Sequence, residues 1–234
     1  MSETPTPTTR QRRKETRPQE LLDAALALFV EKGFAATRSE EVAHRAGVSK
    51  GTLYLYYPSK EELFKAVVRQ TLSLIIAQGI ELAESFEGST SELLVKLMHT
   101  WWERVGDTPA AGIHKVVLAE VRNFPELAQF YTDEVIVPAD RLFSTTVQRG
   151  IDRGEYRPLP VHEVAHALIA PMIFHALHRH SFGACPVHGV DIDATQLLRT
   201  QLEIMLRGLE VRDVPDAAPT TATRTKPASR RRPS

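Results

Sequence analysis

The sequence contains a single cysteine, Cys185, which excludes an intrachain disulfide. It opens on polar residues without an apolar core region, so it shows no secretory signal. No apolar run reaches the ~20 residues that a transmembrane helix needs, and the longest candidate, 161–177, is interrupted by histidines and a glutamate. These absences predict a cytoplasmic protein with no membrane partner.

Net charge is absent too, because 29 Lys and Arg balance 29 Asp and Glu at pH 7. Any affinity for nucleic acid must therefore come from local basic patches. Strand patterns are scarce, whereas capping boxes and apolar residues at helical spacing recur along the chain. No P-loop, dinucleotide fingerprint or Ser–His–Asp set appears. We expect an all-α protein that is not an enzyme and needs no cofactor.

The most informative stretch is TRSEEVAHRAGVSKGTLYLYYPSK, at 37–60. Thr37 and Glu40 have the spacing of a capping box, which predicts that a helix begins here. Gly47 ends that helix, because glycine tolerates the left-handed conformation of a C-terminal cap. Ser49 caps the next short helix. Two short helices joined by a tight turn are typical of a helix-turn-helix.

The second of these helices presents a face suited to DNA. Lys50, Gly51 and Tyr54 fall in one arc at 100° per residue, and this arc is small, cationic and aromatic. Such a face fits the major groove, which is about 12 Å wide. Lys60 follows at the next helix N-terminus, where a phosphate meets both its charge and the helix dipole. We predict that the bases are faced by Lys50, Gly51, Thr52 and Tyr54, and that phosphates are held by Thr37, Arg38, Ser39, Tyr56 and Lys60.

A family resemblance is carried by five short segments: GFAAT at 33–37, VA at 42–43, AGVS at 46–49, GTLY at 51–54 and SKEEL at 59–63. In order and without gaps, they resemble the N-terminal domain of TetR-family transcriptional regulators. The resemblance covers about 17–72, and its one departure is Tyr57, where the family usually has Phe. It implies a repressor that a small effector releases from its operator, by tilting a helix shared between two domains.

The chain is predicted to have four parts. Residues 1–15 form a disordered basic arm, which either adds phosphate contacts or only keeps the chain soluble. Residues 16–72 form a three-helix helix-turn-helix domain, with the shared helix at 60–84. Residues 73–210 form a larger helical domain for effector binding and dimerisation, giving about nine helices in all, and 211–234 form a disordered basic tail.

The last two predicted helices, about 161–182 and 191–209, have more apolar surface than one core needs. Two such helices from each of two chains can build a four-helix interface, and the resemblance implies the same homodimer. A two-fold dimer reads a palindromic, double-stranded operator with half-sites one or more helical turns apart. Within the preceding helix, at 125–153, Pro138 predicts a kink.

Aromatic and sulfur-containing side chains in the larger domain predict an apolar cavity for a small, largely hydrophobic effector. Each of them is equally compatible with a place in the core. The predicted lining is Met98, Trp101, Trp102, Phe124, Phe130, Tyr131, Met172, Phe174 and His175.

Two histidine sets leave metal binding as an alternative. His162 and His166 form a literal H-E-x-x-H, the zinc-protease pattern, but its third ligand is missing and Glu203 is the one substitute to test. A second set, His178, His180, Cys185 and His188, either senses a metal or is simply solvated. We predict no metal. The competing functions are a helical hydrolase and a sequence-blind architectural DNA-binding protein.

Overall fold

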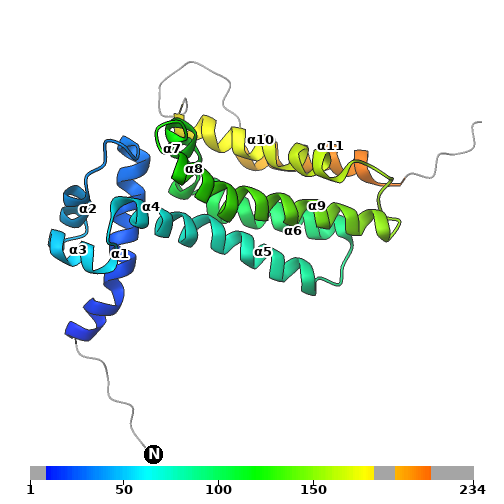
Figure 1. The fold of residues 1–234 in the computed structure, drawn as a ribbon. Coiled ribbons are helices and arrows are strands. Elements are labelled where there is room, and N and C mark those ends of the chain that lie inside the picture. Colours follow the sequence, from blue (N-terminus) through cyan, green and yellow to red (C-terminus); the bar gives the residue numbers. More distant parts are fainter. Residues whose placement is uncertain (1–8, 182–192, 212–234) are drawn as a thin grey trace, which may run out of the picture.

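The computed structural model describes residues 9–181 and 193–211. These residues are helical, with no strand beyond an isolated antiparallel bridge between Tyr156 and Glu210. The all-α prediction is therefore confirmed. A head made of α1 to α4 stands at one end of a longer body of roughly antiparallel helices (Figure 1).

The head contains α1 (Thr9–Lys32), α2 (Ser39–Arg45), α3 (Lys50–Tyr56) and α4 (Lys60–Val68). Helix α1 begins at Thr9, inside the predicted arm, so the expectation of a disordered arm is wrong for residues 9–15. Arg, Gln, Lys and Glu in this segment are good helix formers, which lets the helix extend upstream. Residues 1–8 and the predicted tail from residue 212 lie outside the described residues.

Three phenylalanines form the centre of the head. Phe29, Phe34 and Phe64 are buried, with ring centroids 5.3–5.7 Å apart. Phe34 also packs edge-on against Phe124 of the body, at 4.8 Å. This ring contact extends the apolar core from the head into the body.

Helix α4 continues without a break into the body. A π-helical turn, Arg69–Ser73, joins it to α5 (Leu74–Ser85), which agrees with the predicted shared helix. By length and composition alone, Lys60–Ser85 would be able to cross a membrane. Of its 18-residue apolar window, 33% is buried inside the structure, and Leu63 and Phe64 of the same helix lie in the core.

The body is built from five further continuous helices. The first is α6 (Thr90–Trp101), which ends in the π-turn Trp102–Gly106, and the second is the 3₁₀ turn Pro109–Ala111 followed by α7 (Gly112–Glu120). The third joins α8 (Pro125–Tyr131), the π-turn Thr132–Ile136 and α9 (Val137–Asp152). The last two are α10 (Val161–Ser181) and α11 (Ala194–Leu209). The described residues thus contain nine continuous helices, as predicted.

Pro138 lies inside the continuous helix 125–152, as predicted, at the second residue of α9 and directly after the π-turn Thr132–Ile136. The π-turn is a helix irregularity directly before this proline, and the predicted kink itself stays a prediction.

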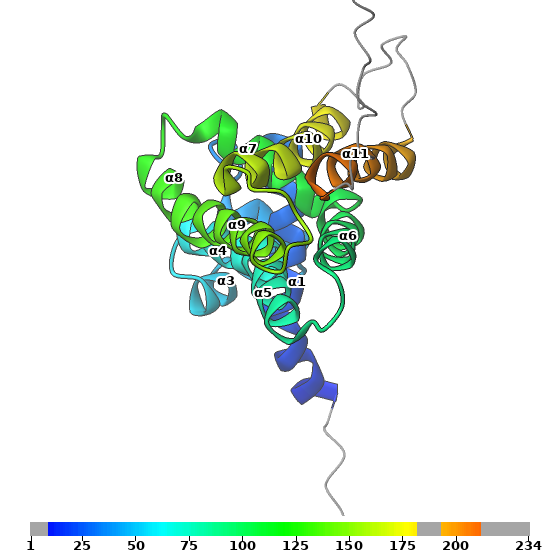
Figure 2. The ribbon, with the colours of Figure 1, turned by 90° about the vertical axis from the view of Figure 1, so that its right-hand side faces the viewer.

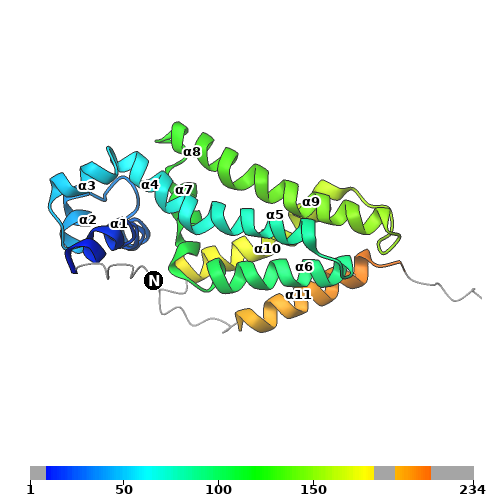
Figure 3. The same ribbon diagram turned by 90° about the horizontal axis from the view of Figure 1, so that it is seen from below.

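The views along and below the body show how its helices pack (Figure 2, Figure 3). Helix α9 lies between α5, α6 and α10, and α11 lies on the outside against α6 and α10. This arrangement leaves α10 and α11 at one side of the molecule.

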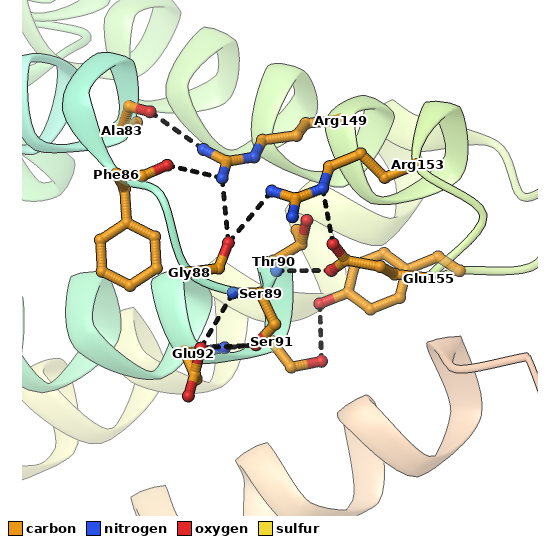
Figure 4. Close-up of polar contacts among 11 residues, drawn as sticks. Ala83, Phe86, Gly88, Ser89, Thr90, Ser91, Glu92, Arg149, Arg153 and Glu155 are labelled. Carbon is orange, nitrogen blue, oxygen red and sulfur yellow. Dashed lines mark hydrogen bonds and ion pairs between the residues drawn. The ribbon is translucent and has the colours of Figure 1, made fainter.

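At the end of the body away from the head, Arg149 of α9 caps the C-terminal end of α5 (Figure 4). Its guanidinium donates to the carbonyl oxygens of Ala83 (3.2 Å), Phe86 (2.7 Å) and Gly88 (3.1 Å) at the end of α5. These carbonyls have no partner within the helix, so a cation there caps them and complements the helix dipole. The next helix starts with a capping box between Ser89 and Glu92.

Candidate nucleic-acid interface and ligand cavity

Helix α3 is held to the head by one side and exposes the other. Leu53 is fully buried, and the Ser49 hydroxyl caps the helix by accepting from the Thr52 backbone N–H at 3.1 Å. Lys50, Gly51 and Tyr54 are exposed. The residues predicted to face DNA bases therefore share one accessible face, with Thr52 half-buried beside it.

Lys50 is paired within the head. Its ammonium forms an ion pair with Glu40, in the first turn of α2, and lies 5.7 Å from the centroid of the Tyr54 ring. The hydrogen bond with Lys50 lowers the pKa of the Glu40 carboxyl, and the same bond raises the pKa of Lys50. A phosphate or base that contacts Lys50 would therefore compete with Glu40 for the ammonium.

The residues before α2 differ from the prediction. Helix α2 begins at Ser39, and Glu41 accepts a hydrogen bond from the Arg38 backbone N–H at 3.3 Å, so the predicted Thr37–Glu40 capping box is wrong. Thr37 is 1% exposed, and its hydroxyl donates to the carbonyls at the end of α1. Ser39 is buried as well. Thr37 and Ser39 therefore lie below the surface that a phosphate reaches, while Arg38 is exposed.

Lys60 lies in the first turn of α4, as predicted, but its ammonium already has partners. It donates to the carbonyl oxygens of Phe34 (2.9 Å) and Ala35 (3.2 Å) and lies 4.4 Å from the Phe34 ring centroid. Lys60 thereby ties the loop between α1 and α2 to α4. Tyr56 is half-buried at the end of α3.

The body contains a partly open cavity of about 540 Å³ between α5, α6, α7, the α8–α9 helix and α10. Its lining is mainly aliphatic, and it includes Leu72 and Ile76 of the helix shared with the head. Four of the nine predicted lining residues contribute to it: Trp101, Tyr131, Met172 and Phe174.

The other five predicted lining residues are elsewhere, so that part of the prediction is wrong. Met98 is fully buried in the core, and the Trp102 ring packs on His175 at 5.3 Å. Phe124 packs on the head, and Phe130 lies under the Arg69 guanidinium, 5.0 Å away. No sequence pattern distinguishes the aliphatic residues that line the cavity from those that fill the core, because both sets are apolar and have the same helical spacing.

One polar pair stands out in the cavity lining. The ring nitrogen Nδ1 of His114, on α7, is hydrogen-bonded to the Tyr131 hydroxyl. His114 is 6% exposed and its Nε2 has no partner. Burial, and then the neighbouring His180, lower the pKa of His114 to about 4, and burial raises the pKa of Tyr131. Both side chains are neutral at pH 7.

His162 and His166, the predicted alternative metal ligands, both face Asp140 of α9. The Nδ1 atoms lie 3.1 Å and 3.5 Å from the two carboxylate oxygens. Glu203 forms an ion pair with Arg207. Within residues 9–181 and 193–211, no three His, Cys, Asp or Glu side chains are grouped to hold a metal ion. Cys185 and His188 lie outside the described residues.

Comparisons with known proteins agree with this architecture. Residues 21–67 match the family described as bacterial regulatory proteins, tetR family, and residues 87–184 match the tetracyclin repressor-like C-terminal domain. The transcriptional regulator YfiR of Bacillus subtilis is 32% identical over 148 residues, which are 62% of this chain and 71% of YfiR.

One further sequence relative and one solved structure are also similar to this chain. The transcriptional repressor KstR2 of Rhodococcus jostii is 28% identical over 155 residues, covering 66% of this chain and 74% of KstR2. The structure of the regulator FadR from Bacillus subtilis in complex with stearoyl-CoA has the same fold, with a TM-score of 0.64 at 19% identity over 81% of this chain and 98% of FadR. The chain belongs to the TetR family of transcriptional regulators.

Proposed function

We propose that the protein is a homodimeric repressor that binds a palindromic operator and is released from it by a small, largely apolar effector. One observation carries the proposal. A single continuous helix, Lys60–Ser85, packs in the head that presents α3 and also lines the cavity in the body. A ligand in the cavity therefore touches the same rigid element that supports the DNA-facing helix.

In this proposal, Lys50, Gly51, Thr52 and Tyr54 face the bases. Arg38, Tyr56 and Lys60 are the proposed phosphate contacts, with Lys60 exchanging one of its carbonyl partners. Thr37 and Ser39 are omitted because both are buried. Phosphate contacts position the head, and base-edge contacts select the sequence.

The proposed dimer is formed by α10 and α11. Phe174 on α10 is 70% exposed and Ile204 on α11 is 66% exposed. Large apolar side chains on neighbouring helices are typical of a surface that another chain covers. A second copy would set the spacing of the two α3 helices, and the effector acts by favouring a spacing that no longer fits successive major grooves.

An apolar effector is supported by the mainly aliphatic lining of the cavity. Release of a repressor by such a ligand is supported by the relative KstR2, which is named a repressor, and by the similarly folded FadR, whose structure was solved in complex with stearoyl-CoA. Since a DNA-binding regulator works where the genome is, we propose a cytoplasmic location.

The test begins by selecting an operator from random double-stranded DNA. Fluorescence polarisation at about 150 mM salt then compares the selected DNA with a scrambled duplex, and a preference of about 1,000-fold is expected for specific recognition. Lys50→Ala should weaken operator binding more than scrambled binding. Lys96→Ala, on the body, is the matched control and should change neither.

Two outcomes would contradict the proposal. Equal affinity for selected and scrambled DNA would favour a sequence-blind architectural protein. Equal losses on both duplexes with Lys50→Ala would remove Lys50 from the base-reading set.

A further inference from the structure

We infer that the ligand cavity is completed by a second copy of the chain, which covers the rim of the cavity at Ala170 and Phe174 of α10. The inference rests on the proposed function, because it starts from the dimer and the ligand site proposed above. It adds that one chain holds only part of the ligand site, so that dimerisation and ligand binding depend on each other.

The cavity is partly open, and some of the side chains that line it are also exposed to solvent. Leu118 on α7 is 60% exposed, Ile136 in the π-turn before α9 is 50% exposed and Phe174 on α10 is 70% exposed. Ala170, one turn before Phe174, is exposed and part of the lining as well. The polar members of this exposed lining are Gln78 and His166. An apolar ligand held by one chain would therefore stay partly in contact with water at this rim.

Helix α10 is apolar on its exposed side as well as on its buried side. Between Glu163 and Arg179 it contains no Asp, Glu, Lys or Arg. Its buried side packs in the core, whereas an outer strip is exposed, made of Ala167, Ala170, Pro171 and Phe174. A helix that is apolar all round is normally buried all round. The outer strip is therefore a surface that another molecule covers.

The outer strip and the rim of the cavity share two residues. A helix has 3.6 residues per turn, which places Ala170 and Phe174 between Ile173, on the cavity side, and Pro171, on the outer side. Both shared residues are exposed and both line the cavity. A chain that packs on the outer strip therefore also reaches the edge of the cavity.

A second copy of this chain is the occupant that fits the outer strip. The exposed apolar surface continues onto α11, which packs against α10 and exposes Ile204 (Figure 2). One turn further, a Cβ added at Gly208 would meet no atom within 4 Å, so this part of α11 is open to a close approach. An apolar surface is complementary to itself, as a two-fold interface requires. Two helices from each chain then pack as a four-helix interface.

The experiment measures how tightly the full-length protein binds an apolar probe as a dimer and as a monomer. The probe is N-phenyl-1-naphthylamine, which is neutral and fluoresces in apolar sites. Fluorescence titration gives its dissociation constant, and sedimentation velocity gives the mass of the protein under the same conditions. Ala139→Phe fills the cavity from α9 and should abolish the signal, which assigns the bound probe to the cavity.

Two variants separate the chains without touching the cavity. Ile204→Glu places a charge in the interface, and Ile204 does not line the cavity. Gly208→Trp removes no contact within the chain, because the new side chain starts in open space. Each variant should be a monomer that binds the probe about tenfold more weakly, within the usual range of coupling between sites. Since such coupling is reciprocal, the probe should also strengthen the dimer of the unaltered protein.

Leu74→Glu is the matched control. Leu74 on α5 is 48% exposed and belongs neither to the cavity lining nor to the outer strip. The same change from an apolar side chain to a carboxylate should therefore leave the mass and the probe affinity unchanged.

A monomeric variant that binds the probe as tightly as the dimer would overturn the inference and leave the proposed function standing. If both variants stay dimeric and bind the probe normally, the second copy does not pack on this surface and the inference fails too. A monomeric unaltered protein would remove the dimer from the proposed function, and the inference with it.

Discussion

Glu120 links the two parts of the molecule: its Oε1 accepts a hydrogen bond from the backbone N–H of Ala35 at 2.9 Å. Glu120 ends α7, the helix that brings His114 and Val117 to the cavity. Ala35 lies in the loop that leads into the helix-turn-helix. The bond therefore joins the helix that lines the cavity to the DNA-binding head, alongside the α4–α5 helix and the Phe34–Phe124 ring contact.

Removing this link should reduce the response to ligand. Glu120→Ala is expected to lower the ligand-induced change in operator affinity by about fivefold or more, within the usual range of coupling between sites. Glu120→Gln keeps an acceptor oxygen and should retain most of the response. The measurement is operator affinity by fluorescence polarisation with and without an apolar compound that is first shown by screening to release the protein from its operator. An unchanged response in Glu120→Ala would show that the coupling does not pass through this bond.

In the proposed function, DNA must compete with Glu40 for the Lys50 ammonium. Glu40→Gln should raise affinity for both operator and scrambled DNA by about two- to threefold at low salt, because it frees Lys50 and removes a negative charge near the phosphates. The gain should shrink at high salt, where exposed charges are screened. Glu31→Gln, at the Arg45 ion pair, tests whether loss of any nearby carboxylate has the same effect.

The buried His114 should make the protein less stable in acid. Its folded pKa is about 4 and its ordinary value 6.5, so the unfolded chain binds a proton in this window and the folded protein does not. The contribution is fully present above pH 6.5 and is lost as pH falls towards 4, by about 2 kcal/mol between pH 6.5 and 5. Urea denaturation across this range should show a shallower pH dependence for His114→Phe. The pKa values of His175 and His180 are lowered too, and both remain in the variant, so they provide the common background.

The cap at the far end of the body should matter for stability. Arg149→Met keeps the length of the side chain but removes three charged hydrogen bonds, and it is expected to lower the free energy of unfolding by about 2–3 kcal/mol. Arg153→Met is the control, because Arg153 is more exposed and reaches only the Gly88 carbonyl of this turn (Figure 4). Equal losses in the two variants, measured by thermal or urea unfolding, would show that general charge removal is responsible.

Local interactions explain which features were predictable from the sequence. Caps, glycine stops and the 3.6-residue period involve residues within about four positions of each other. Gly33 and Gly47 end their helices with φ of 85° and 66°, and Ser49 caps α3 as its spacing predicts. The helix count, the exposed face of α3 and the shared helix followed from such signals.

Long-range packing explains the errors. Thr37 has the spacing of an N-cap, but it lies one residue before the cap position, and the end of α1 takes its hydroxyl instead. Phe124 and Phe130 have the composition of a ligand pocket, yet one packs on the head and the other under Arg69.

The sequence by itself determined the helices, their order and the side of α3 that meets solvent, because these depend on neighbours along the chain. Only the tertiary structure decided which apolar residues line a cavity and which fill the core, since this depends on the angles and separations at which helices pack. It also decided the pairing of Glu40 with Lys50, of His114 with Tyr131 and of Glu120 with Ala35, because these partners meet only once the helices are assembled.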